Sequence, residues 1–358
     1  MKKQIIITTS LIFASLFVTA QTENELLKRA RELHDKILTL DTHVDTPIRF
    51  RKNKTIDIGK CNDSMKVDLV KMEEGGLDAV FFVVYRPQGA QTDTAFDKAY
   101  NDSKKQFAAI YRQIEQNSNK AQLVTNRAEA VKAKEQGKRA IFIGVENGYC
   151  LGKNINVIKE FYTMGARYLT LCHMKDGEIC KSSSDTTTAD YGLTDFGREV
   201  IQEMNRVGML IDVSHVSDQT VRDVVACSKT PIIASHSSVR AICDNARNLS
   251  DDLIQLIAEN GGVIQIGIYT GYLKPRTMGR ATVSDIVDHI DHIVRLVGIN
   301  HVGFGSDFDG GGGVVGCEDA SGIINITTEM LRRGYTDQDI EKFWSLNFFR
   351  VMEQAEGE

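Results

Sequence analysis

The residues best suited to chemistry in this chain are histidines and acids that end short apolar runs. The sequence has 358 residues and eight histidines. Four of these end separate apolar runs or lie just beyond them: His43, His173, His215 and His236. Asp45 follows His43 by two residues, so in extended chain the two side chains point to the same side. An imidazole and a carboxylate on one side are the first half of a metal site.

Carboxylates follow two other apolar runs and lie within a third. Glu146 comes directly after the run 140–145, where an unpaired charge would be costly, and its two oxygens can bridge two cations. Asp307 follows the run 301–306 and adds an acid or base group. Asp212 lies inside a run and is suited either to ligation or to orienting a neighbouring histidine. The acids therefore supply a predicted bridge and groups for proton transfer.

The combined set of ligands exceeds the needs of one tetrahedral zinc. It consists of His43, Asp45, His215 and His236 as terminal ligands and Glu146 as the bridge. This set predicts two divalent cations about 3.5–4 Å apart, which activate a shared water for hydrolysis. Histidine and carboxylate suit Zn²⁺, and Mn²⁺ or Co²⁺ stay open by ligand type. The seven cysteines form no CxxC pair, so we expect mostly buried free thiols and no cysteine-based zinc site.

Other polar features have plainer interpretations. His289 and His292 lie among acidic residues in a helical pattern, which predicts a solvated charged face. The glycines at 310–313 would suit a phosphate cradle, but no Lys-Ser or Lys-Thr follows, so a flexible loop is favoured. His34 and His301 are expected to have no role in chemistry.

Eight apolar or β-branched runs must position these side chains. We predict strands at Ile37–Thr42, Ala79–Tyr85, Ala140–Val145, Tyr168–Cys172, Met209–Val213, Pro231–Ser235, Gly262–Ile268 and His301–Ser306. Helical periodicity separates most of them, as in 196–207, 218–226 and 283–296. This alternation predicts parallel β-α-β units, and eight units predict an α/β fold of the closed (β/α)8 (TIM-type) barrel class. Such barrels carry their active sites at the C-terminal ends of the strands.

The N-terminus has the pattern of an export signal. A basic start, an apolar run over residues 5–19 and small residues up to Ala20 predict a signal peptide at 1–20. Residues 21–358 then form a single catalytic barrel domain, exported to the periplasm or the extracellular space. The net charge of −5 gives no indication of a nucleic-acid partner. The C-terminus is acidic, so no membrane anchor is predicted.

The motifs, taken together, resemble those of the membrane (renal-type) dipeptidases. The matching segments are Asp41-Thr42-His43-Val44-Asp45-Thr46-Pro47, Gly144-Val145-Glu146-Asn147-Gly148, Tyr168-Leu169-Thr170-Leu171-Cys172-His173, Gly192-Leu193-Thr194-Asp195, Asp212-Val213-Ser214-His215, Ser235-His236-Ser237-Ser238, Arg247-Asn248-Leu249-Ser250 and Gly305-Ser306-Asp307-Phe308-Asp309-Gly310. They are colinear from about residue 36 to 353. The set is specific, although no single motif would suffice.

The resemblance implies a role for each matching residue. His43 and Asp45 would hold one zinc, His215 and His236 the other, and Glu146 would bridge both. His173 would contact the substrate and stabilise the oxyanion. Arg247 would bind the substrate's free carboxylate, and Asp307 would carry a proton to the leaving amine.

The implied function is a zinc-dependent dipeptidase, with two Zn²⁺ per subunit and a metal-bridging hydroxide as nucleophile. Its substrates would be dipeptides with a free C-terminal carboxylate, including D-residues at that position. The oligomeric state stays open, with a homodimer as one possibility. Two alternatives stay open: a binuclear amidohydrolase for a cyclic amide, acyl-amino acid or lactone, and a barrel that binds without turnover. The loop after His173 lacks the family's usual Trp, and the only Trp is Trp344, so substrate preference is the least determined property.

Overall fold

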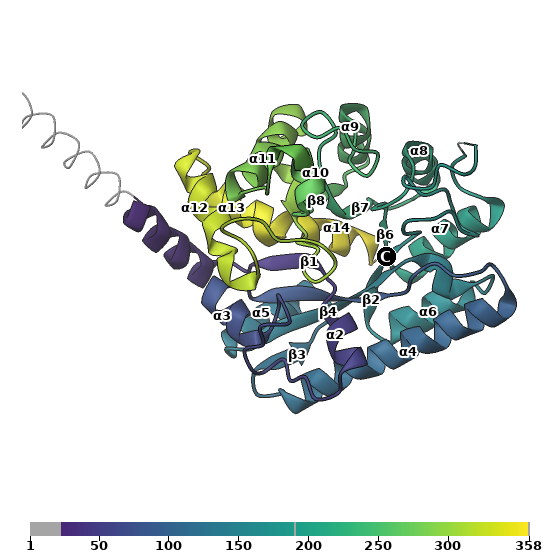
Figure 1. Ribbon diagram of the computed structural model, residues 1–358, viewed down its shortest axis with the longest axis horizontal. Helices are drawn as coiled ribbons and strands as arrows, with labels where there is room; N and C mark the ends of the chain where they lie inside the picture. The colour runs from purple at the N-terminus through teal and green to yellow at the C-terminus, as the bar shows by residue number, and fades with distance from the viewer. Residues whose placement is uncertain (1–22, 190, 357–358) are drawn as a thin grey trace, which may run out of the picture.

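The computed structural model describes residues 23–189 and 191–356, and its centre is a parallel sheet. Hydrogen-bonded neighbours follow the order β1-β2-β4-β5-β6-β7-β8-β9 (Figure 1). The strands are β1 (Leu40–Val44), β2 (Ala79–Tyr85), β3 (Ala121–Leu123), β4 (Arg139–Glu146), β5 (Ala166–Thr170), β6 (Leu210–Asp212), β7 (Ile233–Ser237), β8 (Val263–Ile266) and β9 (Val302–Phe304). β3 lies off this path and pairs with β4.

The ends of the path meet at the C-terminal side of the strands. The Asp45 N–H donates to the Phe308 carbonyl at 2.8 Å, and the Asp307 N–H donates to the His43 carbonyl at 3.0 Å. These bonds join the end of β1 to the segment after β9. The eight strands therefore form a nearly closed parallel barrel, as the alternating pattern predicted.

Helices connect the strands and surround the barrel (Figure 1). Residues 23–36 are helical. The other helices are α2 (Pro47–Lys52), α3 (Leu69–Gly75), α4 (Asp93–Gln116), α5 (Arg127–Glu135), α6 (Asn156–Thr163), α7 (Asp195–Val207), α8 (Asp218–Cys227), α9 (Asp251–Glu259), α10 (Thr270–Leu273), α11 (Val283–Val297), α12 (Ile324–Arg332), α13 (Asp337–Glu341) and α14 (Asn347–Ala355). Short turns lie at η1 (Gly148–Leu151), η2 (Arg276–Met278), η3 (Ile299–His301), η4 (Ala320–Gly322) and the π-helical η5 (Lys342–Leu346).

Side-chain caps fix where several of these helices begin. Thr194 accepts a hydrogen bond from the Gly197 N–H at the start of α7, and Ser217 does the same for Thr220 at the start of α8. Thr282 and Asp285 form a reciprocal capping box at α11. Each cap satisfies an N–H group that the first helical turn leaves free. The caps thus set the length of the loops that carry site residues.

Aromatic packing fills the N-terminal end of the barrel. Phe81 of β2 lies 4.7 Å from Phe142 of β4, centroid to centroid, and 5.2 Å from Phe348 of α14. Phe142 also contacts Phe349 at 5.9 Å. All four rings are buried. Helix α14 therefore closes one end of the barrel with apolar side chains and leaves the other end for polar groups.

The strand predictions are confirmed in number and order along the barrel, with shifted bounds. β1 begins at Leu40 rather than Ile37, because helix 23–36 extends almost to that point. β7 begins at Ile233, two residues after Pro231, which has no N–H to give to a ladder. The short β3 was not predicted. The predicted signal peptide lies outside the described residues, and no helix within those residues has the length and apolarity to cross a membrane.

Candidate metal centre

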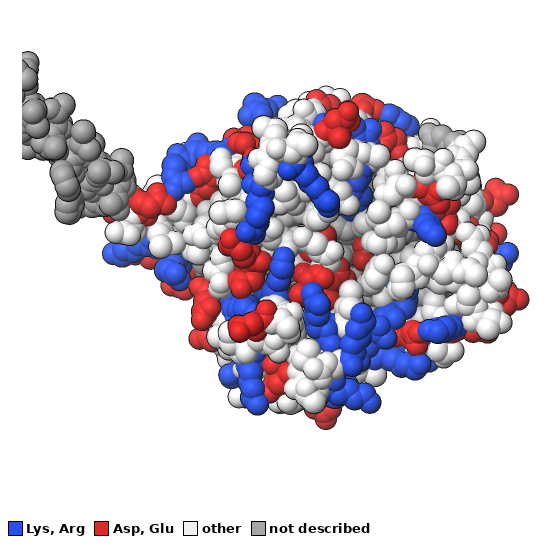
Figure 2. All heavy atoms as spheres, viewed as in Figure 1, with Lys and Arg blue, Asp and Glu red and all other residues white. Residues whose placement is uncertain are grey.

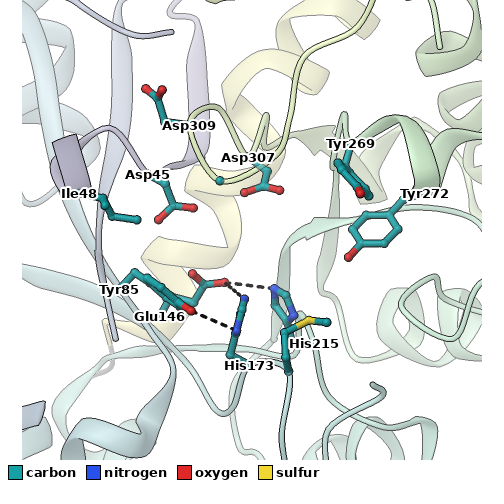
Figure 3. Close-up of a pocket in the computed structure, with 12 residues that line it drawn as sticks. Asp45, Ile48, Tyr85, Glu146, His173, His215, Tyr269, Tyr272, Asp307 and Asp309 are labelled. Carbon is teal, nitrogen blue, oxygen red and sulfur yellow. Dashed lines mark hydrogen bonds and ion pairs between the residues drawn. The ribbon is translucent and has the colours of Figure 1, made fainter. Parts of the chain in front are cut away.

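Seven of the predicted site residues converge at the open end of the barrel. His43 lies in β1, Glu146 ends β4 and His236 lies in β7. The others follow the ends of strands: Asp45 after β1, His173 after β5, His215 after β6 and Asp307 after β9. Parallel strands bring their carboxyl ends to one edge. Side chains up to 264 positions apart in the chain therefore share one mouth (Figure 3).

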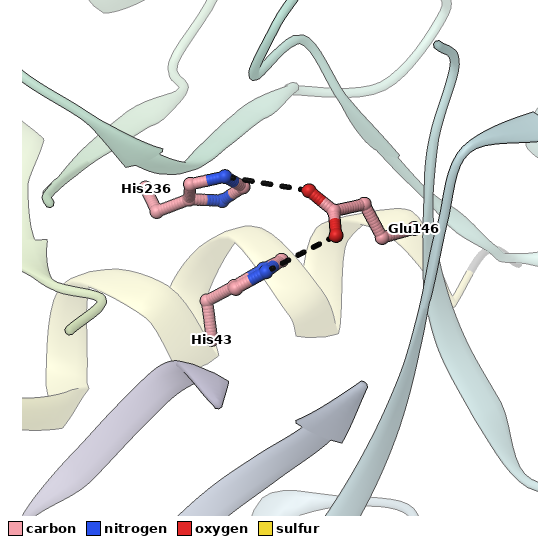
Figure 4. A group of neighbouring side chains, drawn as sticks. All are labelled: His43, Glu146 and His236. Carbon is pink, nitrogen blue, oxygen red and sulfur yellow. Dashed lines mark ion pairs between the residues drawn. The ribbon is translucent and has the colours of Figure 1, made fainter. Parts of the chain in front are cut away.

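Glu146 is the centre of this cluster, and its two oxygens face different partners. Oε1 lies 3.1 Å from Nε2 of His215 and 3.5 Å from Nε2 of His236. Oε2 lies 3.7 Å from Nε2 of His43 (Figure 4). His43 Nε2 in turn lies 3.8 Å from Oδ2 of Asp45. Oε1 therefore faces His215 and His236, and Oε2 faces the side of His43.

The nitrogen and oxygen atoms of this cluster are suited to bind divalent cations, because they do not all satisfy one another by hydrogen bonds. The Nε2 atoms of His215 and His236 face each other at 2.9 Å, and the buried Nε2 of His43 and Oδ1 of Asp45 have no hydrogen-bond partner. Ligand atoms of His43, Glu146 and His236 lie within 4.8 Å of one another, as do those of Glu146, His173 and His215. Unpaired buried polar atoms are destabilising, so a cation among them would satisfy both charge and geometry.

Burial keeps most of the imidazoles in the form that can bind metal. It lowers the pKa of His215 and His236 well below the usual value, and Arg247 adds to this effect. Burial opposes the charged form of Glu146 as well, yet His43 and His173 hold its pKa well below the usual value. A neutral imidazole and an ionised carboxylate are the ligating forms of these groups.

A second set of side chains orients two of the histidines, His43 and His236. The Tyr168 hydroxyl lies 2.9 Å from Nδ1 of His43, and the Ser235 hydroxyl lies 2.9 Å from Nδ1 of His236. Ser235 donates to Asp212 at 2.6 Å. Asp212 thus acts through Ser235 rather than as a ligand, which decides between the two interpretations of this residue. With Nδ1 engaged in this way, Nε2 is directed towards Glu146.

Asp307 lies across the mouth from Glu146, next to Asp45 (Figure 3). Removal from water, together with the carboxylates of Asp45 and Glu146, raises the pKa of Asp307 well above its usual range. Gly310 covers both aspartates, because a Cβ at this position would lie 2.1 Å from Oδ1 of Asp307 and 2.2 Å from Oδ2 of Asp45. A carboxyl group with a raised pKa is suited to accept a proton and to pass it on.

Backbone strain is concentrated at the same mouth. Four non-glycine residues among those described have positive φ: Asn147 (78°), His215 (71°), Asp307 (60°) and Asp309 (66°). Each follows the end of a barrel strand. Left-handed conformations of such residues cost about 1–2 kcal/mol each and occur where function demands a fixed direction of the side chain.

The mouth opens into a cavity of about 320 Å³ (Figure 3). Besides the predicted residues, its walls are formed by Ile48, Tyr85, Met174, Tyr269, Tyr272, Asp309 and Gly310. Arg247 does not line this cavity. Its guanidinium donates to the His236 carbonyl at 2.6 Å and to the Ser237 hydroxyl at 2.9 Å, and it lies 5.6 Å from the centre of the Tyr272 ring. Its Nε is buried and has no partner.

Comparison with known proteins agrees with this geometry. The sequence model of the family described as membrane dipeptidase (peptidase family M19) matches residues 27–358. The chain belongs to the membrane dipeptidase family. A fission yeast (Schizosaccharomyces pombe) protein described as an uncharacterized dipeptidase is 33% identical over 95% of this chain and 86% of its own length. Dipeptidase 3 of Macaca fascicularis is 34% identical over 93% of this chain and 68% of its own length.

Solved structures show the same architecture. The probable dipeptidase PvdM of Pseudomonas aeruginosa superposes with a TM-score of 0.88 at 28% identity, covering 93% of this chain and 99% of that one. A metallopeptidase of Rhodobacter sphaeroides has the same fold, with a TM-score of 0.81 at 23% identity, and covers 89% of this chain and 99% of that one. The membrane dipeptidase assignment makes this chain a peptide-bond hydrolase of a metal-dependent family.

One interpretation from the sequence was wrong in this membrane dipeptidase. His289 is fully buried rather than solvated, because Nδ1 accepts from the Val239 N–H and Nε2 lies 2.9 Å from the Leu273 carbonyl. The run 310–313 lies in a turn in which the N–H groups of its first three glycines all donate to the Asp307 carbonyl. The expectation of mostly buried free thiols is confirmed: all seven cysteines are free and five are buried.

Sequence reasoning missed the tyrosines of the cavity. Tyr85 is the last residue of β2, and its hydroxyl lies 3.5 Å from Nδ1 of His173. Tyr269 and Tyr272 follow β8 within six residues of its end. A search for aromatic hydroxyls at strand ends, and not only for ionisable groups, would have found Tyr85.

Proposed function

We propose that this membrane dipeptidase uses two zinc ions to hydrolyse dipeptides that have a free C-terminal carboxylate. The observation that carries the proposal is that the two oxygens of Glu146 face different histidines, Oε1 facing His215 and His236 and Oε2 facing His43. His43 and Asp45 would hold one ion, and His215 and His236 the other. When bound, two divalent cations supply a polarised carbonyl and a water of lowered pKa.

The remaining groups of the mouth have chemistry that suits the steps of hydrolysis. His173 borders the cavity and lies 3.9 Å from Glu146, with a pKa that burial lowers. Its imidazole is placed to donate to the oxygen that gains charge when the peptide carbonyl is attacked. Asp307, with its raised pKa, can take a proton from the attacking water and give it to the leaving amine.

Arg247 would select substrates by their carboxylate. Two of its N–H groups donate to the last two residues of β7, which leaves a fixed guanidinium with an unpartnered Nε beside Tyr272. A planar guanidinium binds a carboxylate through paired hydrogen bonds. Since Arg247 lies behind the cavity wall, the proposal requires Tyr272 to shift when substrate binds.

A dipeptide panel tests the proposal. The solved Rhodobacter relative holds a phosphinate mimic of L-Ala-D-Ala, so the panel should contain L-Ala-L-Ala, L-Ala-D-Ala and their C-terminal amides. We expect hydrolysis of both acids and little of the amides. Chelation should abolish activity, and added Zn²⁺, Mn²⁺ or Co²⁺ should restore it, with two ions per chain by elemental analysis. Activity that persists in protein shown to be free of metal would refute the metal mechanism.

Variants of two neighbouring arginines test the selection. Arg247→Ala and Arg247→Lys should reduce the preference for acid over amide by at least about tenfold, the effect of losing one charged hydrogen bond. Arg240→Ala is the matched control, because Arg240 is bound to Asp218 at 2.6 Å. An unchanged preference in both Arg247 variants would contradict the assignment.

The cellular context completes the proposal. Residues 1–20 would be removed on export, and residues 21–358 would act as one domain in the periplasm or outside the cell, where peptides from cell-wall turnover occur. The homodimer stays a prediction, which light scattering of the purified protein would test.

A further inference from the structure

A second pocket, of about 390 Å³, lies beside α2 and the start of α4. Its charged lining residues are Arg51 of α2, Arg86 after β2, and Lys98 and Asp102 of α4. Here it is called the arginine pocket, after Arg51 and Arg86. Lys and Arg side chains gather on the face of the molecule over α2 and α4 (Figure 2).

Arg86 is buried in this pocket without an acidic partner. It is 5% exposed, and one terminal nitrogen donates to the side chain of Gln106. Its Nε has no hydrogen-bond partner. The Nε of Arg51 is likewise buried and unpartnered. Within the described part of the chain, neither arginine has a carboxylate within 4.0 Å.

The acid in the pocket does not compensate the charge of the two arginines. Burial and the nearby Arg51 lower the pKa of Arg86 to about 10, because both make the charged form of the guanidinium less favourable. Asp102 is the one acid in the lining, but it already binds Lys98 at 2.6 Å and Lys105 at 2.9 Å. Two guanidinium groups therefore share a pocket whose acid is already neutralised. A buried charge without a counter-charge is costly, so an anion bound here would stabilise the protein.

The arginine pocket is distinct from the substrate cavity. No residue lines both. Tyr85 and Arg86 are consecutive at the end of β2, so their side chains leave on opposite faces of the sheet. Tyr85 borders the substrate cavity, whereas Arg86 points towards α4, where it reaches Gln106.

We propose that the arginine pocket binds an anionic group, a phosphate or a carboxylate, through the guanidinium groups of Arg51 and Arg86. Charge-assisted hydrogen bonds from paired guanidinium groups suit both anions. The site lies outside the peptidase chemistry and does not depend on the proposed function.

Calorimetric titration of the metal-loaded enzyme tests the site. The probes are inorganic phosphate and succinate, each at constant ionic strength set with chloride, and the tighter of the two identifies the preferred head group. We expect binding that Arg51→Gln weakens at least tenfold. Arg86→Gln should act in the same way. If that variant fails to fold, the test rests on Arg51, which is half-buried on the short helix α2.

Two controls separate the arginine pocket from other sources of binding. Lys52→Gln removes one positive charge from the same helix at an exposed position outside the pocket, and it should leave anion binding and peptidase activity unchanged. Glu146→Gln disrupts the metal centre and should also leave anion binding in place. Binding that is lost in Glu146→Gln but kept in Arg51→Gln would place the anion at the metals and overturn the proposal. The absence of binding by either probe would overturn it as well.

Discussion

Two groups of histidines in this molecule are mostly buried but differ in what their nitrogens contact. The mouth histidines, His43, His173, His215 and His236, converge on Glu146. The helix-layer histidines, His34 and His289, have a protein partner on each ring nitrogen. In the mouth, the fully buried Nε2 of His43 has no hydrogen-bond partner.

This difference shows what marks a ligand. Burial does not, because His289 and His43 are both inaccessible to solvent. Proximity to acids does not, because His292 also contacts an acid, Asp251 at 2.8 Å. The mark is the convergence of several histidine Nε2 atoms on one buried carboxylate, Glu146.

The largest expected effect comes from removing the centre of the mouth cluster. Glu146→Gln should reduce dipeptide hydrolysis by at least about 1,000-fold and lower the bound metal, because a neutral amide cannot balance two cations. Steady-state kinetics and elemental analysis measure both quantities.

The matched control is a buried acid at the other end of the barrel. Asp78 is bound by Lys134 at 2.7 Å and Arg139 at 3.1 Å. Asp78→Asn should lower the free energy of unfolding while metal content stays unchanged. If Asp78→Asn lost metal as completely as Glu146→Gln, the loss would reflect general destabilisation, and the distinction between the two regions would fail.

Gly310→Ala gives the next largest effect. An added Cβ would overlap the carboxylates of Asp45 and Asp307, so one of them must move. We expect kcat/KM to fall about 100-fold, the usual consequence of displacing a reacting group by about 1 Å. Gly177→Ala is the control, because its Cβ would meet only the end of the Gln88 side chain at 3.3 Å. Equal losses in both variants would contradict the argument from close packing.

The sequence predicted the mouth better than the helix layer. The order of strands and the seven convergent residues followed from apolar runs that end in histidine or acid, a local pattern. His289 was misjudged because Asp285, Asp288 and Asp291 surround it in sequence, whereas its partners Val239 and Leu273 are remote in the chain.

The orientation of groups was also beyond the sequence. Nothing local shows that Arg247 turns its N–H groups to the His236 carbonyl, or that Glu146 divides its oxygens between partners. Such contacts depend on the stagger of strands and on the positive φ of residues such as His215. Strand periodicity does not encode these features.

Lowering the pH should have an intermediate effect, on the free energy of unfolding, through the helix-layer histidines. Burial lowers the pKa of His34 to about 4, against 6.5 in the unfolded chain. The unfolded state therefore binds the extra proton first, so stability from neutral His34 is complete above pH 6.5 and is lost as the pH falls towards 4. The loss at pH 5 is about 2 kcal/mol.

Urea unfolding at pH 7 and pH 5 measures this loss. In His34→Gln, the difference in unfolding free energy between the two pH values should be smaller by about 2 kcal/mol. His289, whose pKa is also lowered to about 4, should still make the free energy of unfolding of this variant fall between pH 7 and pH 5. An identical pH dependence in the variant and the wild-type protein would show that His34 is not held neutral by burial.

The smallest effect tests how the mouth histidines are oriented. Ser235 donates to Asp212 at 2.6 Å, which leaves its oxygen to accept the Nδ1 proton of His236 at 2.9 Å. This chain of bonds fixes the tautomer whose Nε2 lone pair faces Glu146. Ser235→Ala breaks the chain, so metal affinity should fall about tenfold in a chelator competition, while saturating metal should restore most of kcat.

Ser238→Ala is the control for that measurement, because Ser238 is buried just after the same strand but donates to the Gly267 carbonyl at 3.0 Å. Its metal affinity should match that of the wild-type protein. If Ser235→Ala also keeps full affinity, His236 holds its orientation through the backbone alone. The hydrogen bond to Nδ1 would then not be needed for ligation, and the convergence of the Nε2 atoms on Glu146 alone would separate the mouth histidines from the helix layer.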